Sequence, residues 1–373
     1  MKHGGDVYSD GLLKGKNLLD YSSNINPLPI SKDFSAHIDE ALNKVMLYPD
    51  VKYRTLKDNI IQYLSDSEEY FSKEHKKSSE KTYLSSIARE NIIVGNGASE
   101  VLDLVIASLK SITIVVPSFI EYEDFSKKYG LKINYSYLNE NMEYDYNNIL
   151  SAVEETDGLI IGNPNNPNGC IIDFSKFKAI LDKCEQCNKL AIIDEAFIEF
   201  ILDYDKSLIR YIDKYSCLVI VRAITKFYGM PGIRFGYGIT RNEKLLRYFS
   251  NNQNPWSVNC FAELAVKYVL KDEKFINKSK LWIEDERSFM YKNLNNINFI
   301  EKVYISYGNY FLCKLKYTSS YNLYEKMMKR GILIRNCDNY KGLNEYFIRL
   351  AVKDRKSNET LIKVLKDIEN EVL

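Results

Sequence analysis

Short apolar runs alternate with segments of helical periodicity through the middle of the chain. In residues 98–110, for example, apolar side chains recur at the spacing of one helix face. Five other runs are apolar on nearly every residue, as expected of strands that are covered on both faces. They are residues 92–94, 112–116, 159–161, 190–193 and 218–221. This order predicts an α/β fold with helices packed on a mainly parallel sheet.

The pattern changes toward both ends of the chain. Residues 1–40 are irregular and rich in turns, whereas long helical patterns and short strand-like runs (310–314 and 347–351) follow residue 245. We therefore predict a large domain over 41–245 and a small C-terminal α+β domain over 246–373. The arm 1–40 is expected to contribute to the small domain and to the active site. The polar stretch 65–90 predicts a solvated helix or a mobile loop and indicates no role.

Composition narrows the class of partner. The chain has 373 residues, 45% of them hydrophobic, enough for two domains. Its 51 Lys and Arg nearly balance 50 Asp and Glu, which argues against a nucleic acid or an anionic membrane as partner. We found no apolar run of signal-peptide or membrane-spanning length. The expected partner is a small molecule in a pocket.

The seven cysteines are scattered and odd in number, which indicates reduced thiols in a cytoplasmic protein. Cys184 and Cys187 form a CxxC pair, but no second pair or nearby histidine completes a zinc site. We therefore expect two thiols one helical turn apart and no metal.

Two loops at the carboxyl ends of predicted strands are candidates for ligand contacts, because open α/β sheets bind ligands at that edge. In the first, residues 95–100 (GNGASE) open a helix whose free N–H groups suit an anion such as phosphate. In the second, residues 163–169 (NPNNPNG) form a rigid loop whose amides can bind a ligand. Taken singly, the first pattern is more often a plain strand–turn–helix corner, and the second is as often a turn with no further role.

Four charged residues carry the candidate chemistry. Asp194 ends an apolar strand, where a carboxylate needs a cation such as a protonated pyridine nitrogen or an arginine. Lys226 follows the next strand, and a lysine of lowered pKa suits Schiff-base chemistry. Arg335 and Arg349 lie at strand-like runs and offer planar forks for carboxylate or phosphate, which indicates a dianionic substrate. Ion pairing and solvated surface positions are the structural alternatives.

Together, and in this order, these motifs resemble the fold-type-I pyridoxal-phosphate enzymes of the aspartate aminotransferase superfamily. The resemblance implies a large three-layer α/β/α domain with a mostly parallel sheet, a smaller α+β domain, and a homodimer with shared active sites. It also implies that pyridoxal 5′-phosphate is the cofactor, that Lys226 is the Schiff-base lysine and proton shuttle, and that Asp194 pairs with the pyridine nitrogen.

The same resemblance implies the remaining site residues. Arg349 matches the arginine that receives the substrate carboxylate, Asn166 bonds the ring hydroxyl and Tyr122 stacks on the ring. Tyr48 reaches the cofactor phosphate from the neighbouring subunit. The other residues expected at that phosphate are Gly97, Ala98, Ser99, Thr225 and Arg234. Ala223 stands where many relatives carry a hydroxyl, so one phosphate contact is missing or supplied elsewhere.

Within the superfamily the chain is most similar to threonine-phosphate decarboxylases, relatives of histidinol-phosphate aminotransferases. The likeness rests on residues 3–5 (HGG), 20–28 (DYSSNINPL) and 334–343 (IRNCDNYKGL). It implies decarboxylation of L-threonine O-3-phosphate to (R)-1-amino-2-propanol O-2-phosphate in cobalamin biosynthesis, with His3, Asn24 and Arg335 on the substrate phosphate. Phe197, where many aminotransferases have tyrosine, agrees with this.

Two alternatives stay open. A histidinol-phosphate aminotransferase would use the same residues, since the orientation of one bond at Cα selects the reaction. The other alternative is a non-catalytic regulator that binds pyridoxal phosphate. The presence of Lys226, Asp194 and Arg349 together argues against it.

Overall fold

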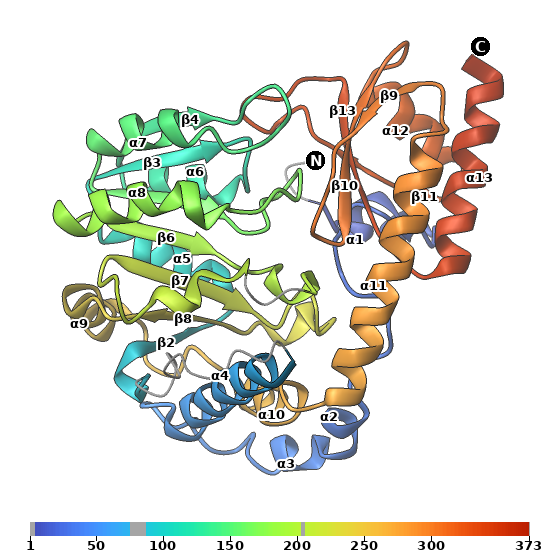
Figure 1. The fold of residues 1–373 in the computed structure, drawn as a ribbon. Coiled ribbons are helices and arrows are strands. Elements are labelled where there is room, and N and C mark those ends of the chain that lie inside the picture. The colour runs from blue at the N-terminus through green and yellow to red at the C-terminus, as the bar shows by residue number, and fades with distance from the viewer. Residues whose placement is uncertain (1–3, 75–86, 203–205, 373) are drawn as a thin grey trace.

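A computed structural model of the protein describes residues 4–74, 87–202 and 206–372. A seven-stranded sheet forms the large layer, in the order β2-β8-β7-β6-β5-β3-β4, and β8 alone runs opposite to the direction of the other strands. The predicted α/β class with a mainly parallel sheet is confirmed (Figure 1). The strands are β2 (Ile92–Gly95), β3 (Ser111–Val116), β4 (Lys132–Tyr137), β5 (Gly158–Gly162), β6 (Leu190–Asp194), β7 (Leu218–Ala223) and β8 (Gly236–Thr240).

Helices cover both faces of this sheet, which explains the continuous apolar runs. Within β6, Ile192 belongs to the core on one face and Ile193 to the core on the other. The first face is covered by α5 (Ala98–Ala107), α6 (Glu121–Lys128) and α9 (Glu243–Asn252). The second is covered by α4 (Arg54–Glu74), α7 (Tyr146–Glu154), α8 (Phe174–Gln186) and α10 (Cys260–Val269). Residues 75–86 of the predicted polar stretch lie outside the described residues.

Two strands of the sheet were not predicted, for different physical reasons. β4 lies at the edge, where Lys132 and Tyr137 are exposed, so its sequence is too polar to be recognised as a strand. β8 contains Gly236 and Gly238, which weaken the strand pattern. A Cβ on Gly236 would lie 2.2 Å from the Ala98 nitrogen, so glycine is required for the sheet to approach the start of α5.

A second layer of structure lies beside the large sheet (Figure 1). It contains a four-stranded antiparallel sheet ordered β12-β13-β10-β9. Its strands are β9 (Ile300–Val303), β10 (Tyr310–Leu315), β12 (Arg335–Asn336) and β13 (Phe347–Ala351). Three helices accompany it: α11 (Glu273–Leu294), α12 (Ser320–Lys329) and α13 (Arg355–Val372). None of the helices within the described ranges is long and apolar enough to cross a membrane.

The N-terminal arm contacts both layers. Its strand β1 (Leu19–Asp20) pairs in parallel with β11 (Ile332–Leu333). Further along, the Asn26 side chain donates to the Phe227 carbonyl oxygen at 2.7 Å, and the Asn26 N–H donates to the Lys226 carbonyl oxygen at 3.1 Å. The arm, which includes the short helices α1 (Val7–Asp10), α2 (Lys32–Ala36) and α3 (Ile38–Leu42), thereby joins the small sheet to the loop that carries Lys226.

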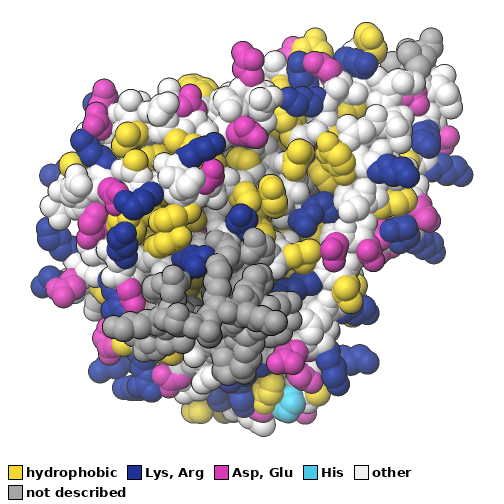
Figure 2. Space-filling view, in the orientation of Figure 1, with side chains coloured by type: hydrophobic (Ala, Val, Ile, Leu, Met, Phe, Trp, Pro, Cys, Tyr) yellow, Lys and Arg dark blue, Asp and Glu magenta, His cyan; other side chains and the backbone are white. Residues whose placement is uncertain are grey.

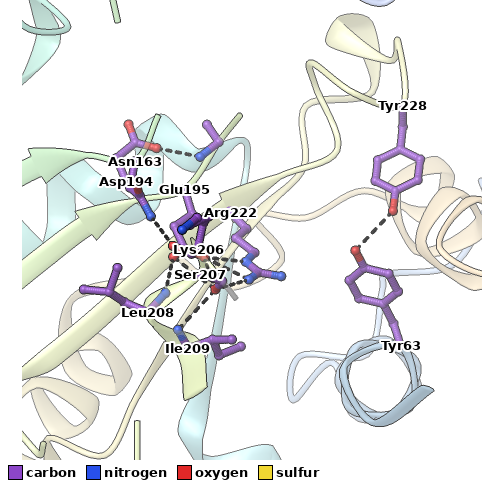
Figure 3. Close-up of polar contacts among 11 residues, drawn as sticks. Tyr63, Asn163, Asp194, Glu195, Lys206, Ser207, Leu208, Ile209, Arg222 and Tyr228 are labelled. Carbon is purple, nitrogen blue, oxygen red and sulfur yellow. Dashed lines mark hydrogen bonds and ion pairs between the residues drawn. The ribbon is translucent and has the colours of Figure 1, made fainter. Parts of the chain in front are cut away.

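A buried ionic network fixes the ends of β6 and β7 (Figure 3). The Arg222 guanidinium donates to Glu195 Oε2 at 2.8 and 3.0 Å and to Ser207 Oγ at 2.8 Å. The Leu208 N–H donates to the other carboxyl oxygen of Glu195 at 2.8 Å. Removing one partner of such a buried pair costs about 3–5 kcal/mol, so the network holds these strand ends in place. On the surface, acidic and basic side chains intermingle over the face drawn in Figure 2.

Candidate active site

Lys226 and Asp194 meet at one edge of the large sheet. β6 ends at Asp194 and its neighbour β7 ends three residues before Lys226. Asp194 is buried, at 8% exposure. Burial lowers the pKa of Lys226, and the negative charge of Asp194 partly offsets this lowering across the same site. Lys226 lines a cavity of about 80 Å³ together with Asn166, Phe197 and other residues of both layers.

The environment of Lys226 favours its neutral amine. Burial lowers its pKa to about 8, and the positive charges of Arg349 and Arg234 act in the same direction. The amine nitrogen lies 5.9 Å from the centre of the Phe197 ring. A neutral amine is the form that attacks a carbonyl carbon, so this lysine is prepared for nucleophilic chemistry.

This pKa predicts a pH dependence of attachment. In cofactor-free protein, the rate at which pyridoxal phosphate becomes attached to Lys226 is expected to rise with pH and to be half-maximal near pH 8, because about half of the amine is neutral there. An ordinary lysine, with a pKa of about 10.4, is less than about 1% neutral at that pH. Absorbance and mass spectrometry of the residue-226 peptide measure the rate.

Arg349→Gln supplies the control for this pH dependence. The substitution removes a neighbouring positive charge, so the pKa of Lys226 should rise and the half-maximal point should move to higher pH. A half-maximal rate above pH 10 in the wild type would contradict the prediction.

Asp194 is held by two donors. The Tyr122 hydroxyl donates to Oδ2 at 2.6 Å, and the Ala196 N–H donates to Oδ1 at 3.0 Å. Burial raises the pKa of the Asp194 carboxyl, whereas both hydrogen bonds lower it. Burial also raises the pKa of Tyr122 well above its usual value, so the phenol remains a donor. Tyr122 therefore lies against Asp194, and its stacking role stays a prediction.

The start of α5 forms an anion cradle. Gly97, at a φ of +83°, precedes the helix, and no side chain caps its first N–H groups. A Cβ on Gly97 would lie 2.7 Å from a guanidinium nitrogen of Arg234, so the arginine closes over the glycine. The Ser99 hydroxyl donates to Glu121 Oε2 at 3.0 Å. Free N–H groups, a helix dipole and a guanidinium together suit a phosphate.

Arg335 and Arg349 lie directly opposite each other on the antiparallel strands β12 and β13. Both are buried, at 1% and 5% exposure. Arg349 donates to the Ser22 carbonyl oxygen at 2.6 Å, to the Tyr340 hydroxyl at 3.3 Å and to Asn166 Oδ1. Like charges facing each other across a sheet are destabilising, so this pair suggests a site for anions.

Tyr340 lies between the two arginines. Its ring centre is 5.1 Å from the Arg335 guanidinium carbon, while its hydroxyl accepts from Arg349. Arg335 also donates to Asn339 Oδ1 at 2.8 Å. Neither Tyr340 nor Glu121 was assigned a role from the sequence, although Tyr340 lies in the 334–343 motif and Glu121 precedes Tyr122.

Two unsatisfied polar atoms show that this cavity suits a ligand. Asn24 Oδ1 and Arg349 Nε are buried and have no hydrogen-bond partner within the described residues. Both residues line the cavity that contains Lys226. Buried polar groups are rarely left without partners, so one acceptor and one charged donor here fit a polar, anionic ligand.

The remaining predicted residues lie in different places. Thr225 is partly buried and directly precedes Lys226. Tyr48 is 80% exposed, and its ring packs against Trp256 with the ring centres 4.7 Å apart, outside this subunit's own cavity. His3 lies outside the described residues.

Comparisons with known proteins show which family the chain resembles. Residues 16–365 match the aminotransferase class I and II family. The chain is 39% identical to a protein of Caldanaerobacter subterraneus subsp. tengcongensis that is provisionally named a threonine-phosphate decarboxylase, over 99% of this chain and 94% of that protein. It is 29% identical to the threonine-phosphate decarboxylase of Salmonella typhimurium, over 98% and 96% of the two chains.

A solved structure is also similar. The histidinol-phosphate aminotransferase of Clostridium acetobutylicum superimposes with a TM-score of 0.88 and 46% identity, over 95% of this chain and all of that one. Fold, site and comparisons define a pyridoxal-phosphate-dependent enzyme of fold type I. The chain belongs to the aminotransferase class I and II family.

Proposed function

We propose that the protein decarboxylates L-threonine O-3-phosphate to (R)-1-amino-2-propanol O-2-phosphate, a reaction of cobalamin biosynthesis. The observation that carries this proposal is the register of Arg335 opposite Arg349 beside Lys226. Threonine phosphate presents a phosphate and a carboxylate on one small amine, which is the combination that two adjacent guanidinium groups bind. The similarity to two proteins named for this activity supports the same substrate.

The cofactor is expected to lie between the cradle and the carboxylate. Its phosphate would be held by Gly97, Ala98, Ser99, Thr225 and Arg234, and its ring nitrogen would pair with Asp194. Asn166 and Tyr122 would contact the ring. When bound, the ring supplies an electron sink for the electrons of the broken bond.

The residues of this chain then orient the substrate. We assign the carboxylate to Arg349 and the phosphate to Arg335, Asn24 and His3. Fixing both anionic ends sets which bond at Cα stands perpendicular to the ring, and such orientation is a large part of catalysis. The Lys226 amine, with its pKa of about 8, can give a proton to Cα near neutral pH.

The active site is completed by a second subunit in this proposal. An exposed apolar stretch carries Tyr48, with Met46 at 95% exposure and Leu47 at 67%. Exposed apolar side chains grouped in this way mark interaction surfaces. We infer a homodimer in which Tyr48 of one subunit reaches the cofactor phosphate of the other.

Product analysis tests the proposed reaction. Purified holoenzyme is incubated with threonine phosphate, and separately with histidinol phosphate and 2-oxoglutarate. We expect carbon dioxide from the first mixture and no glutamate from the second. Arg335→Gln should lower kcat/KM for threonine phosphate about 100-fold, as truncation of one partner of a buried charge pair does. Exposed Arg247→Gln is the matched control.

Histidinol-phosphate aminotransferase is the second candidate, favoured by the 46% identity to the Clostridium acetobutylicum enzyme. It uses the same cradle, lysine and arginines but breaks the Cα–H bond. Glutamate formation that depends on histidinol phosphate, without carbon dioxide from threonine phosphate, would replace the first proposal with this one.

A further inference from the structure

A second cavity, of about 240 Å³, lies on the other side of the lysine-bearing loop. It shares no lining residue with the Lys226 cavity among the described parts of the chain. Its walls come from α4, the turn after β6, the loop after β7 and the start of α11. The buried residues of its lining, within the described parts of the chain, are Ile198, Ile201, Arg222, Phe227, Tyr228 and Leu270.

Glu199 contributes a buried carboxyl oxygen without a hydrogen-bond partner to this cavity. Its Oε2 atom is buried and has no hydrogen-bond partner among the described residues. Arg222, the cation that influences it, already donates to Glu195 and Ser207. Burial raises the pKa of Glu199 to about 7, so its carboxylate would gain from a cation.

Three aromatic residues line the same cavity. The Tyr228 hydroxyl donates to the hydroxyl of Tyr63 on α4 at 3.4 Å (Figure 3), and both residues line the cavity together with Arg222. Buried Phe227 adds a third ring to the lining. Aromatic faces attract alkylammonium ions, and that attraction increases where water is excluded.

The other charged side chains of the cavity do not favour a ligand that carries a second charge. Asp66, Lys271 and Glu273 are exposed in the lining and Lys280 is partly buried there, so these four side chains carry two charges of each sign. The volume is below the usual range of about 300–1,000 Å³ for drug-sized ligands, so a small molecule is indicated.

We propose that this cavity binds a small alkylammonium ion, whose charge pairs with Glu199 and whose alkyl groups pack on Tyr63, Phe227 and Tyr228. The site is distinct from the one that holds the amino-acid substrate. Phe227 directly follows Lys226, and Ile276 of the wall lies on α11, which leads to the small antiparallel sheet. A bound cation therefore contacts both the lysine-bearing loop and the helix between the layers.

Choline is a suitable probe because a quaternary ammonium cannot condense with pyridoxal phosphate. Isothermal titration calorimetry of holoenzyme with choline is expected to show one site per chain. The uncharged isostere 3,3-dimethylbutan-1-ol should bind at least about tenfold more weakly, and Glu199→Gln should weaken choline binding at least about tenfold. Glu185→Gln, a partly buried carboxylate outside the cavity, should leave choline affinity unchanged.

Ile276→Phe provides a second test that leaves Glu199 intact. The larger ring should fill the cavity and abolish choline binding without lowering the melting temperature by more than a few degrees. The proposal is overturned if choline does not bind the wild type at millimolar concentration, or if the isostere binds equally well. Equal binding to Glu199→Gln or competition by threonine phosphate would also overturn it.

Discussion

Lys226→Ala is expected to lower kcat/KM by at least about 10⁴-fold. The substitution removes both the covalent anchor of the cofactor and the amine placed to move a proton at Cα, and acid–base catalysis alone contributes up to about 10⁴-fold. Carbon dioxide release from threonine phosphate, or glutamate formation if the aminotransferase candidate holds, measures the loss. After borohydride reduction, only the wild-type peptide that contains residue 226 should carry the mass of the cofactor.

Lys178→Ala is the matched control for this experiment. Lys178 is exposed and paired with Asp182 on α8, so its loss should change kcat/KM by less than about twofold. A Lys226→Ala enzyme that folds normally and keeps a tenth of wild-type activity would refute the role assigned to this lysine.

Asp194→Asn is expected to have the second-largest effect, a loss of about 100- to 1,000-fold in kcat/KM. The substitution leaves the shape of the buried site but removes the charge that would face the ring nitrogen, and a buried hydrogen-bonded charge contributes about 2–5 kcal/mol. The cofactor should also dissociate faster, which dialysis followed by absorbance measures independently of activity.

Two variants separate the charge of Asp194 from its hydrogen bonds. Tyr122→Phe removes one donor and keeps the carboxylate, so its effect should be about tenfold or less. Asp157→Asn changes an exposed carboxylate at the amino end of β5 and should leave cofactor retention unchanged. Wild-type retention and activity in Asp194→Asn would show that the ring nitrogen is not recognised here.

The central strands could be predicted because the pattern that identifies each of them lies within its own segment of the sequence. Residues 190–193 and 218–221 are apolar throughout since helices cover both faces, and this pattern is visible without any knowledge of contacts. β8 was missed because its glycines are needed for a contact with α5, a helix that is distant in the sequence. Such long-range contacts leave no periodic signal in the segment itself.

Some residues of the candidate site could likewise be predicted from the sequence, and others could not. Asp194 and Lys226 could be singled out because a charge at the end of an apolar strand is unusual in itself. The facing arrangement of Arg335 and Arg349 depends on the register of two strands separated by a loop, which no local pattern specifies. The position of Tyr340 beside them, and the unpartnered carboxyl oxygen of Glu199, follow from packing alone.

The parallel pairing of β1 with β11 has a practical consequence for handling the protein. It draws the beginning of the chain inward: a Cβ on Gly4 would lie 2.1 Å from the Ser22 carbonyl oxygen and 3.4 Å from the Arg349 guanidinium. A purification tag fused ahead of Gly4 would extend a segment that packs against the Arg349 guanidinium. A tag attached after α13 avoids that crowding and is the safer choice for measurements of substrate affinity.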